Sequence, residues 1–190
     1  MNDQAEIVQF VITTLESLNV PYFITGSVAS IRYGEYRATN DIDIVARLDE
    51  SHVAGICSRF ALPDFYVSED AALDAVRNRF QFNILHPATG LKADIIVPAL
   101  TEFEASAAQR SRRMKATAHF EAWFSSPEDV ILNKLLFYQM GEAEKHLRDI
   151  AGVLRAGVVS VDRAYIENWA EKLRVLELWK VVEKREREAP

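Results

Sequence analysis

Two aspartates, Asp41 and Asp43, stand in the run DIDIVA, whose other residues are apolar and typical of a buried strand. Alternate residues of a strand point to the same face, so these two carboxylates project together while Ile42 and Ile44 point to the other side. Two parallel carboxylates repel each other, and their burial without a partner is costly. A divalent cation between them would offset that cost, and Mg²⁺ binds such oxygen ligands together with substrate phosphates.

A third carboxylate, Asp94, lies in the otherwise apolar segment LKADIIV, which we expect to form a strand. If the two strands are neighbours, Asp41, Asp43 and Asp94 converge on one face of the sheet. Three acids can hold two metal ions, and such a pair stabilises the attacking and leaving oxygens in phosphoryl transfer. Two simpler interpretations stay open. The first two acids cap a turn at a strand edge, or Asp94 pairs with Lys92.

Gly26 and Ser27 follow an expected strand, PYFIT, and open a short helical segment, SVASIRY. Free backbone N–H groups at the start of a helix bind phosphate oxygens. The glycine lets the backbone approach a ligand closely, and Ser27 adds a hydroxyl donor. Together with the acids, this pair predicts a phosphate-binding turn, although a Gly-Ser pair alone is more often an ordinary turn.

Three further residues are candidates for contacts with a nucleotide. Arg37 and Thr39 precede the acids in GEYRATNDID, and the planar guanidinium of Arg37 either grips a phosphate or pairs with Glu35. Lys134 lies in the apolar segment PEDVILNKLLFYQM and either extends to solvent or contacts a triphosphate. The basic segment QRSRRMK is a solvated loop or a contact for an RNA backbone. No two histidines have ligand spacing, so we assign no zinc site.

The elements that must position these residues follow from hydrophobic periodicity and helix caps. Up to residue 97 the order is helix, strand, helix, strand, helix, helix, strand, strand, which predicts an α/β (α+β) domain on one mixed sheet flanked by helices. Another strand is expected within TAHFEAWF. From Ser126 three helices are expected, the last as one continuous helix over 162–188. We therefore expect a core over residues 1–125 and a C-terminal helical module over residues 126–190.

Composition narrows the class of protein. The 190 residues are 49% hydrophobic and 26% charged with a net charge of −6, as in a globular protein that is not a general polyanion binder. The single cysteine, Cys57, excludes an internal disulfide framework and fits a reducing cytosol. No apolar run is long enough to cross a membrane, and the N-terminus lacks a secretory pattern. We expect a cytoplasmic protein with no membrane partner.

The order of the motifs resembles the polymerase-β-like nucleotidyltransferase superfamily: GS, thirteen residues, DID, and a later single Asp in a strand. The fuller pattern TGSVASIRYGEYRATNDIDIV, with KADIIV and PEDVILNKL…HLRDIAGVL, resembles the AbiEii toxin-like nucleotidyltransferases over roughly 23–154. The resemblance implies a nucleotidyltransferase core. It implies roles for two groups of residues: triphosphate contacts at Gly26, Ser27 and Lys134, and metal ligands at Asp41, Asp43 and Asp94, the last also acting as general base.

The resemblance further implies a metal-dependent transfer of a nucleoside monophosphate from a nucleoside triphosphate to an acceptor hydroxyl. The metal would be Mg²⁺, with Mn²⁺ as the alternative. The acceptor would be RNA, a protein or a small molecule such as an antibiotic, and a toxin would have a separate antitoxin chain as partner. The competing hypothesis is a nucleotide sensor or partner protein without turnover. Two departures matter: many relatives have more chain after the core, and Lys92 shares a face with Asp94 and can neutralise it.

Overall fold

Alternating apolar residues build a six-stranded sheet in the computed structural model, which describes residues 4–34, 39–141 and 143–188. Its strands are β1 (Tyr22–Thr25), β2 (Asp41–Ala46), β3 (Gln81–His86), β4 (Leu91–Ile96), β5 (Arg112–Lys115) and β6 (Glu121–Phe124). The order across the sheet is β3-β4-β2-β1-β6-β5. The β2–β4 and β1–β6 pairs are parallel and the others antiparallel, so the sheet is mixed, as predicted.

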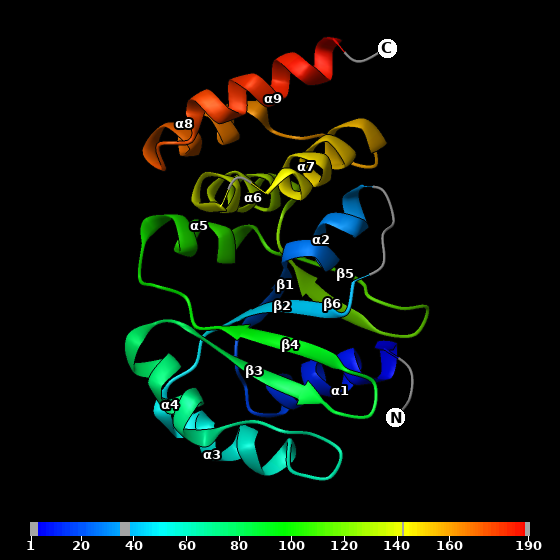
Figure 1. The fold of residues 1–190 in the computed structure, drawn as a ribbon, viewed down its shortest axis with the longest axis vertical. Helices are drawn as coiled ribbons and strands as arrows, with labels where there is room; N and C mark the ends of the chain where they lie inside the picture. Colours follow the sequence, from blue (N-terminus) through cyan, green and yellow to red (C-terminus); the bar gives the residue numbers. More distant parts are fainter. Residues whose placement is uncertain (1–3, 35–38, 142, 189–190) are drawn as a thin grey trace. The chain divides into compact units, whose positions relative to one another are not determined.

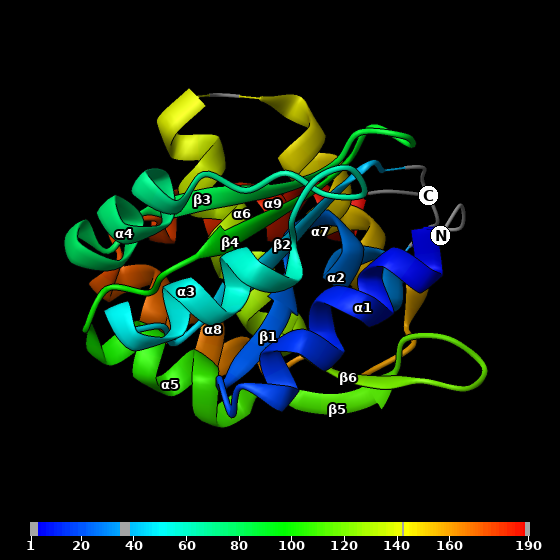
Figure 2. The same ribbon diagram turned by 90° about the horizontal axis from the view of Figure 1, so that it is seen from below.

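One face of this sheet is covered by three helices: α1 (Gln4–Ser17), α3 (Glu50–Arg59) and α4 (Glu69–Asn78). Figures 1 and 2 show these helices together on the same side of the strands. Ile42 and Ile44 of β2 are fully buried, which fits their predicted place on the inner face. Asp49 and Ser68 cap α3 and α4, accepting hydrogen bonds from backbone N–H groups of the first turns. The residues that alternate with Ile42 and Ile44, including Asp41 and Asp43, point to the opposite face of the sheet.

The sequence prediction was incomplete around residues 98–124. No element was expected over α5 (Glu102–Arg110), although Thr101 and Glu104 form a capping box at its start. The basic QRSRRMK segment was expected to be a loop, but part of it forms β5 and pairs antiparallel with β6. The backbone edge that β6 offers explains this change, because an extended segment next to an unpaired strand satisfies its own N–H and C=O groups by pairing.

The chain divides into two compact units. The first comprises Met1–Thr25 and Thr39–Phe124, and the second comprises Gly26–Ala38 and Ser125–Pro190. The helices of the second unit are α2 (Gly26–Tyr33), α6 (Pro127–Gly141), α7 (Glu144–Ala156), α8 (Arg163–Lys172) and α9 (Leu176–Glu188). The C-terminal helices therefore form their compact unit together with α2, a segment that lies far from them in the sequence.

Within the second unit, local signals explain most helix ends. The Ser126 hydroxyl accepts a hydrogen bond from the Asp129 N–H at 3.2 Å and caps α6, the helix expected to begin here. The prediction of one helix over 162–188 was wrong, because the chain turns between α8 and α9 with Arg174 at a φ of 61°. Gly34, just after α2, lies so close to α7 that a Cβ atom there would be 2.9 Å from the Val153 nitrogen. In the part of the chain described, every helix is too short or too polar to cross a membrane.

Candidate active site

A row of polar side chains crosses four strands on the sheet face opposite α1, α3 and α4. Asp43 of β2 is in register with Asp94 of the parallel strand β4. On the outer sides of this pair, Thr25 of β1 is opposite Asp43 and Asn83 of β3 is opposite Asp94. Residues paired in register point to the same face, so all four side chains lie side by side. The strand order therefore brings together the second and third acids predicted from the sequence.

Lys92 lies two residues before Asp94 in β4 and is in register with Asp41. Its Nζ is 2.9 Å from Asp94 Oδ2 and 3.9 Å from Asp41 Oδ1. The Asn83 amide donates a hydrogen bond to Asp94 Oδ1, so both carboxylate oxygens of Asp94 have a donor. The side chain of Asp94 is nearly buried, at 10% exposure, whereas that of Asp41 is 60% exposed. We call Asp41, Asp43 and Asp94, with Lys92 and Asn83, the acid row.

The electrostatics of the acid row favour a positive charge. The hydrogen bond to Asp94, together with the negative charges of Asp94, Asp41 and Asp43, raises the pKa of Lys92 above its usual range, although burial acts in the opposite direction. All three acids therefore act on one cation. The ion pair between Lys92 and Asp94, which their shared face indicated, is present.

The acid row offers carboxylate oxygens, the kind of ligand that a hard metal ion binds. Across the described ranges, no group of three or more His, Cys, Asp or Glu side chains has the arrangement of a metal site. The donor chemistry nevertheless fits Mg²⁺, because carboxylate oxygens are its preferred protein ligands and the acid row already stabilises a cation. The ammonium group of Lys92 already provides a positive charge beside Asp94, 2.9 Å from Oδ2.

The predicted phosphate-binding residues occupy the start of α2 and the segment before β2. Gly26 follows Thr25 directly and has a φ of 61°, a left-handed conformation that favours glycine. Ser27 lies in the first turn of α2, where its carbonyl accepts a hydrogen bond from the Ser30 hydroxyl at 2.9 Å. Thr39 donates its hydroxyl proton to the Asp41 carbonyl oxygen at 3.1 Å and steadies the start of β2. Arg37 lies outside the described residues. The contacts of these residues with a nucleotide remain predictions.

Lys134 has a buried ionic partner. Its Nζ lies 2.6 Å from Asp149 Oδ2, and the side chains are only 4% and 10% exposed. The alternative in which Lys134 extends to solvent is therefore wrong, because tertiary packing between α6 and α7 encloses it. A contact with a triphosphate remains a prediction.

Sequence reasoning missed Asn83 and Thr25. Asn83 is a polar residue in an alternating strand, which by itself indicates only an exposed face. Thr25 ends a strand whose residues are all buried, so its hydroxyl carried no signal of a site. Their association with the acids depends on strand order, and β4 lies between β2 and β3 in the sheet. Local sequence patterns do not specify that order.

The chain matches no protein-family model and no curated protein sequence. It is similar in structure to ANT(2'')-Ia, an antibiotic-resistance factor solved in solution, with a TM-score of 0.60 and 16% identity over 98% of each chain. A crystal structure of ANT(2'')-Ia with adenylyl-2''-tobramycin gives a TM-score of 0.54 and 18% identity, over 96% of this chain and 98% of that one.

Two other solved structures are similar. An antigenic nucleotidyltransferase-like protein from Paracoccidioides brasiliensis has a TM-score of 0.54 and 18% identity, over 94% of this chain and 91% of its own. The lincosamide antibiotic adenylyltransferase LnuA, with lincomycin bound, has a TM-score of 0.50 and 15% identity, over 80% of this chain and 98% of its own. Identities this low concern the fold. The chain therefore has the fold of these nucleotidyltransferases.

Proposed function

We propose that this protein is a nucleotidyltransferase, which transfers a nucleoside monophosphate from a nucleoside triphosphate to an acceptor hydroxyl and releases pyrophosphate. The observation that carries the proposal is the acid row: Asp43 and Asp94 are in register on neighbouring parallel strands, and the charges of both, with that of Asp41, act on Lys92. The fold shared with nucleotidyltransferases supports the same reaction class. The resemblance to the AbiEii-like group in particular stays a hypothesis.

In this reaction the acceptor oxygen forms a bond to the α-phosphorus, and the bond from that phosphorus to the bridging oxygen of pyrophosphate breaks. We assign Asp94 as the general base that takes the acceptor proton, because it is a nearly buried carboxylate in the middle of the acid row. The hydrogen bond from Asn83 fixes the orientation of the carboxylate. Positioning and electrostatic stabilisation supply most of the rate enhancement in such a reaction.

Asp41, Asp43 and Asp94 would hold the metal, Mg²⁺ or alternatively Mn²⁺. Bound there, the metal would neutralise the charge of the triphosphate and of the departing pyrophosphate. Lys92 contacts Asp94 Oδ2, so this lysine and the metal would compete for one carboxylate. The competition predicts that metal affinity rises when Lys92 is replaced by a neutral residue.

The triphosphate is assigned to Gly26, Ser27, Arg37, Thr39 and Lys134. The support for Gly26 and Ser27 is their place at the start of α2, because the N-terminal end of a helix favours a phosphate. Gly26 is also bonded directly to Thr25, the β1 residue opposite Asp43. Lys134 rests on the motif resemblance, and Arg37 and Thr39 rest on their place in the sequence just before the acids.

For the acceptor we place a small molecule first and RNA or a protein second. LnuA holds lincomycin and ANT(2'')-Ia holds adenylyl-2''-tobramycin, so small-molecule acceptors occur on this fold. A net charge of −6 disfavours an extended surface for nucleic acid. A toxin role with an antitoxin partner in the cytoplasm would require an RNA or protein acceptor.

The test is a transfer assay with each nucleoside triphosphate labelled at its α-phosphate, Mg²⁺, and acceptors of three kinds: total RNA, a protein extract and a set of antibiotics. We expect pyrophosphate release and a labelled product with one or more pairs. Asp94→Asn should lower the rate by about a hundredfold or more, since general bases contribute roughly 10²–10⁴. The matched control is Asp64→Asn, an exposed acid in a loop before α4.

Two results would contradict the proposal. Equal rates for Asp94→Asn and the wild type would remove the acid row from the chemistry. Tight binding of a nucleotide with no product on any acceptor would favour the competing hypothesis of a nucleotide sensor without turnover.

A further inference from the structure

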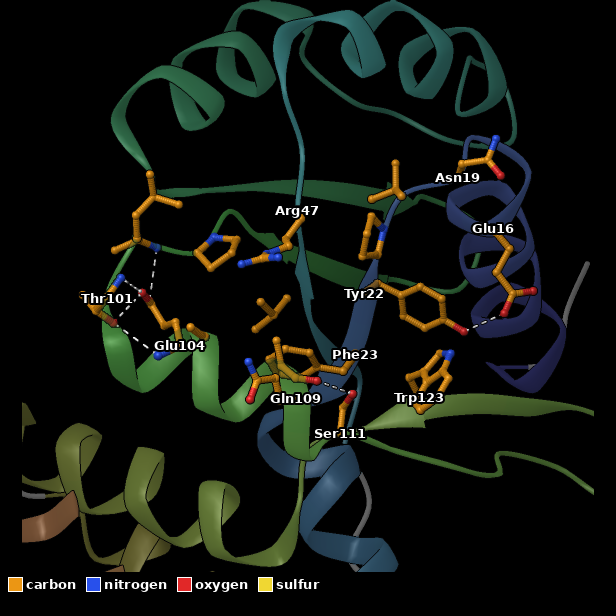
Figure 3. Close-up of a pocket in the computed structure, with 18 of the residues that line it drawn as sticks. Glu16, Asn19, Tyr22, Phe23, Arg47, Thr101, Glu104, Gln109, Ser111 and Trp123 are labelled. Atoms are coloured by element: carbon orange, nitrogen blue, oxygen red, sulfur yellow. Dashed lines mark hydrogen bonds between the residues drawn. The ribbon is translucent and has the colours of Figure 1, made fainter. Parts of the chain in front are cut away.

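A cavity of about 750 Å³ lies in the same compact unit as the acid row. This volume is in the range of about 300–1,000 Å³ that is typical of small-molecule sites. Its walls come from α5, the start of β1, the end of β2 and β6, as Figure 3 shows. None of the catalytic or nucleotide-binding residues assigned above lines it.

Part of the cavity lies on the sheet face that carries the acid row. Phe23 and Val45, which line the cavity, are paired with each other, and the next pair of these two strands that points to the same face is Thr25 and Asp43. Residues two apart in a strand point to the same face and are about 7 Å apart along it. The floor of the cavity, at Phe23 and Val45, is therefore formed by the next pair of side chains on this face after Thr25 and Asp43.

The carboxylates that line the cavity already have hydrogen-bond donors. Glu104 accepts hydrogen bonds from the Thr101 hydroxyl at 2.9 Å and from the Ala99 N–H at 3.1 Å. Glu16 accepts a hydrogen bond from the Tyr22 hydroxyl at 2.9 Å. Both interactions are drawn in Figure 3. These two acids therefore hold the walls together.

Arg47 is the cation that remains for a ligand. Its backbone N–H donates to the Pro21 carbonyl at 2.9 Å, but its guanidinium group makes no hydrogen bond or ion pair within the part of the chain that the structure describes. The side chain points toward the middle of the cavity in Figure 3. Arg113, which also lines the cavity, has Glu121 at 3.6 Å. The planar fork of Arg47 matches a carboxylate, sulfonate or phosphate group.

The remaining walls fit a flat apolar body. Tyr22, Phe23 and Trp123 supply aromatic rings, and the Trp123 side chain remains 37% exposed. On α5 the residues that face the cavity include Ala105 and Ala108, whose small side chains leave its volume open. Aromatic rings pack favourably in offset or edge-to-face arrangements with a planar ligand.

We propose that this cavity binds a small organic anion with a flat aromatic body, and that this molecule is the acceptor of the transfer. The acceptor role rests on the proposed function, whereas the binding does not. The anionic group lies at Arg47, and the reacting hydroxyl is at the opposite end, toward Asp43. The backbone positions of these two residues, four apart in extended chain, are about 13 Å from each other. A polycation is a poor match, because it would face Arg47.

The experiment measures binding of anilinonaphthalene sulfonate, an aromatic anion whose fluorescence rises in apolar surroundings, with no nucleotide or metal present. We expect one dye per chain, displaced by naphthoate but not by the neutral isostere naphthamide. Arg47→Met should weaken dye binding by about ten- to hundredfold, the range for a charged hydrogen bond. The matched control Arg59→Met removes an exposed arginine of α3, on the other face of the sheet, and should change nothing.

A second variant keeps the result interpretable. Ala108→Trp fills the cavity while leaving Arg47 in place, so it should also abolish dye binding, and circular dichroism shows whether each variant is folded. Dye binding that survives both substitutions in folded protein, or that naphthamide displaces as well as naphthoate does, would overturn the proposal.

The two proposals fail in different ways. Asp43→Asn alters the acid row but not the cavity lining, so it should bind the dye like the wild type even though transfer is lost. A wild type that binds the dye but transfers no nucleotide to any acceptor contradicts only the nucleotidyltransferase assignment. In wild-type protein that transfers a nucleotide to an acceptor, an unchanged rate in Ala108→Trp would contradict the acceptor role of the cavity.

Discussion

Replacement of Lys134 by methionine removes the cationic partner of a buried carboxylate. The side chains of Lys134 and Asp149 are 4% and 10% exposed, and their Nζ and Oδ2 atoms are 2.6 Å apart. Methionine preserves most of the packing of the lysine stem, so the main effect is the loss of the ion pair with Asp149. Breaking a buried pair in this way costs about 3–5 kcal/mol. At about 2–4 °C per kcal/mol for a chain of this size, the melting temperature should fall by about 6–20 °C.

Urea unfolding followed by tryptophan fluorescence measures this loss, since Trp179 is fully buried in the same compact unit. The matched control is Lys145→Met, which removes an exposed lysine from the first turn of α7 and should stay within about 0.5 kcal/mol of the wild type. If Lys134→Met unfolds within the same narrow range, the ion pair is not a structural element and the reasoning is refuted.

A double variant separates the structural role of Lys134 from its predicted role at the triphosphate. Lys134→Met with Asp149→Leu removes both charges and should recover most of the lost stability. If Lys134 also contacts the triphosphate, this refolded variant will bind nucleotide more weakly than the wild type. Equal nucleotide affinity in the double variant and the wild type would assign Lys134 to the fold alone.

Three further outcomes are expected. Gly34→Ala should destabilise the fold by about 1–3 kcal/mol in urea melts, because its Cβ would lie 2.9 Å from the Val153 backbone nitrogen; an unchanged midpoint would contradict that close approach. Burial and the hydrogen bond to Glu16 raise the pKa of Tyr22. Just above pH 10 the tyrosine therefore ionises only in the unfolded state, and the free energy of unfolding falls as the pH rises. Tyr22→Phe should make this fall shallower in melts across that pH range. Arg174→Gly should raise stability by up to about 1 kcal/mol by relieving a left-handed backbone, and a lower thermal midpoint would show that the arginine side chain matters more.

The elements with strong local signals were predictable from the sequence. DIDIVA and LKADIIV form strands, and the caps at Asp49, Ser68 and Ser126 mark helix starts. The prediction failed between α8 and α9, where the helical periodicity of the apolar residues outweighed a weak local preference for a turn. The apolar periodicity continues through the turn at residue 174, so the two final helices were merged.

The candidate site was predictable in its residue types but not in its surroundings. The spacing of Asp41 and Asp43 placed them on one face, and Asp94 lies in register with the second of them. Asn83 joins the acid row only because β3 pairs with β4, which is a long-range choice. The burial of Lys134 likewise depends on packing between helices. The cavity at Arg47 is built from segments far apart in the chain, so no local pattern indicates it.

The central claim, that the acid row binds a metal–nucleotide complex, is tested most directly by thermal melts with each nucleoside triphosphate, in Mg²⁺ or in chelator. At a hundredfold excess over the dissociation constant, a ligand specific for the folded state adds about 2.7 kcal/mol, or roughly 5–11 °C for this chain length. We predict such a shift for the wild type only when Mg²⁺ is present, and no shift for Asp43→Asn. In chelator, Asp43→Asn should have a melting temperature no lower than that of the wild type, because one repelling charge is gone. The absence of any Mg²⁺-dependent shift in the wild type, or an equal shift in Asp43→Asn, would contradict the account.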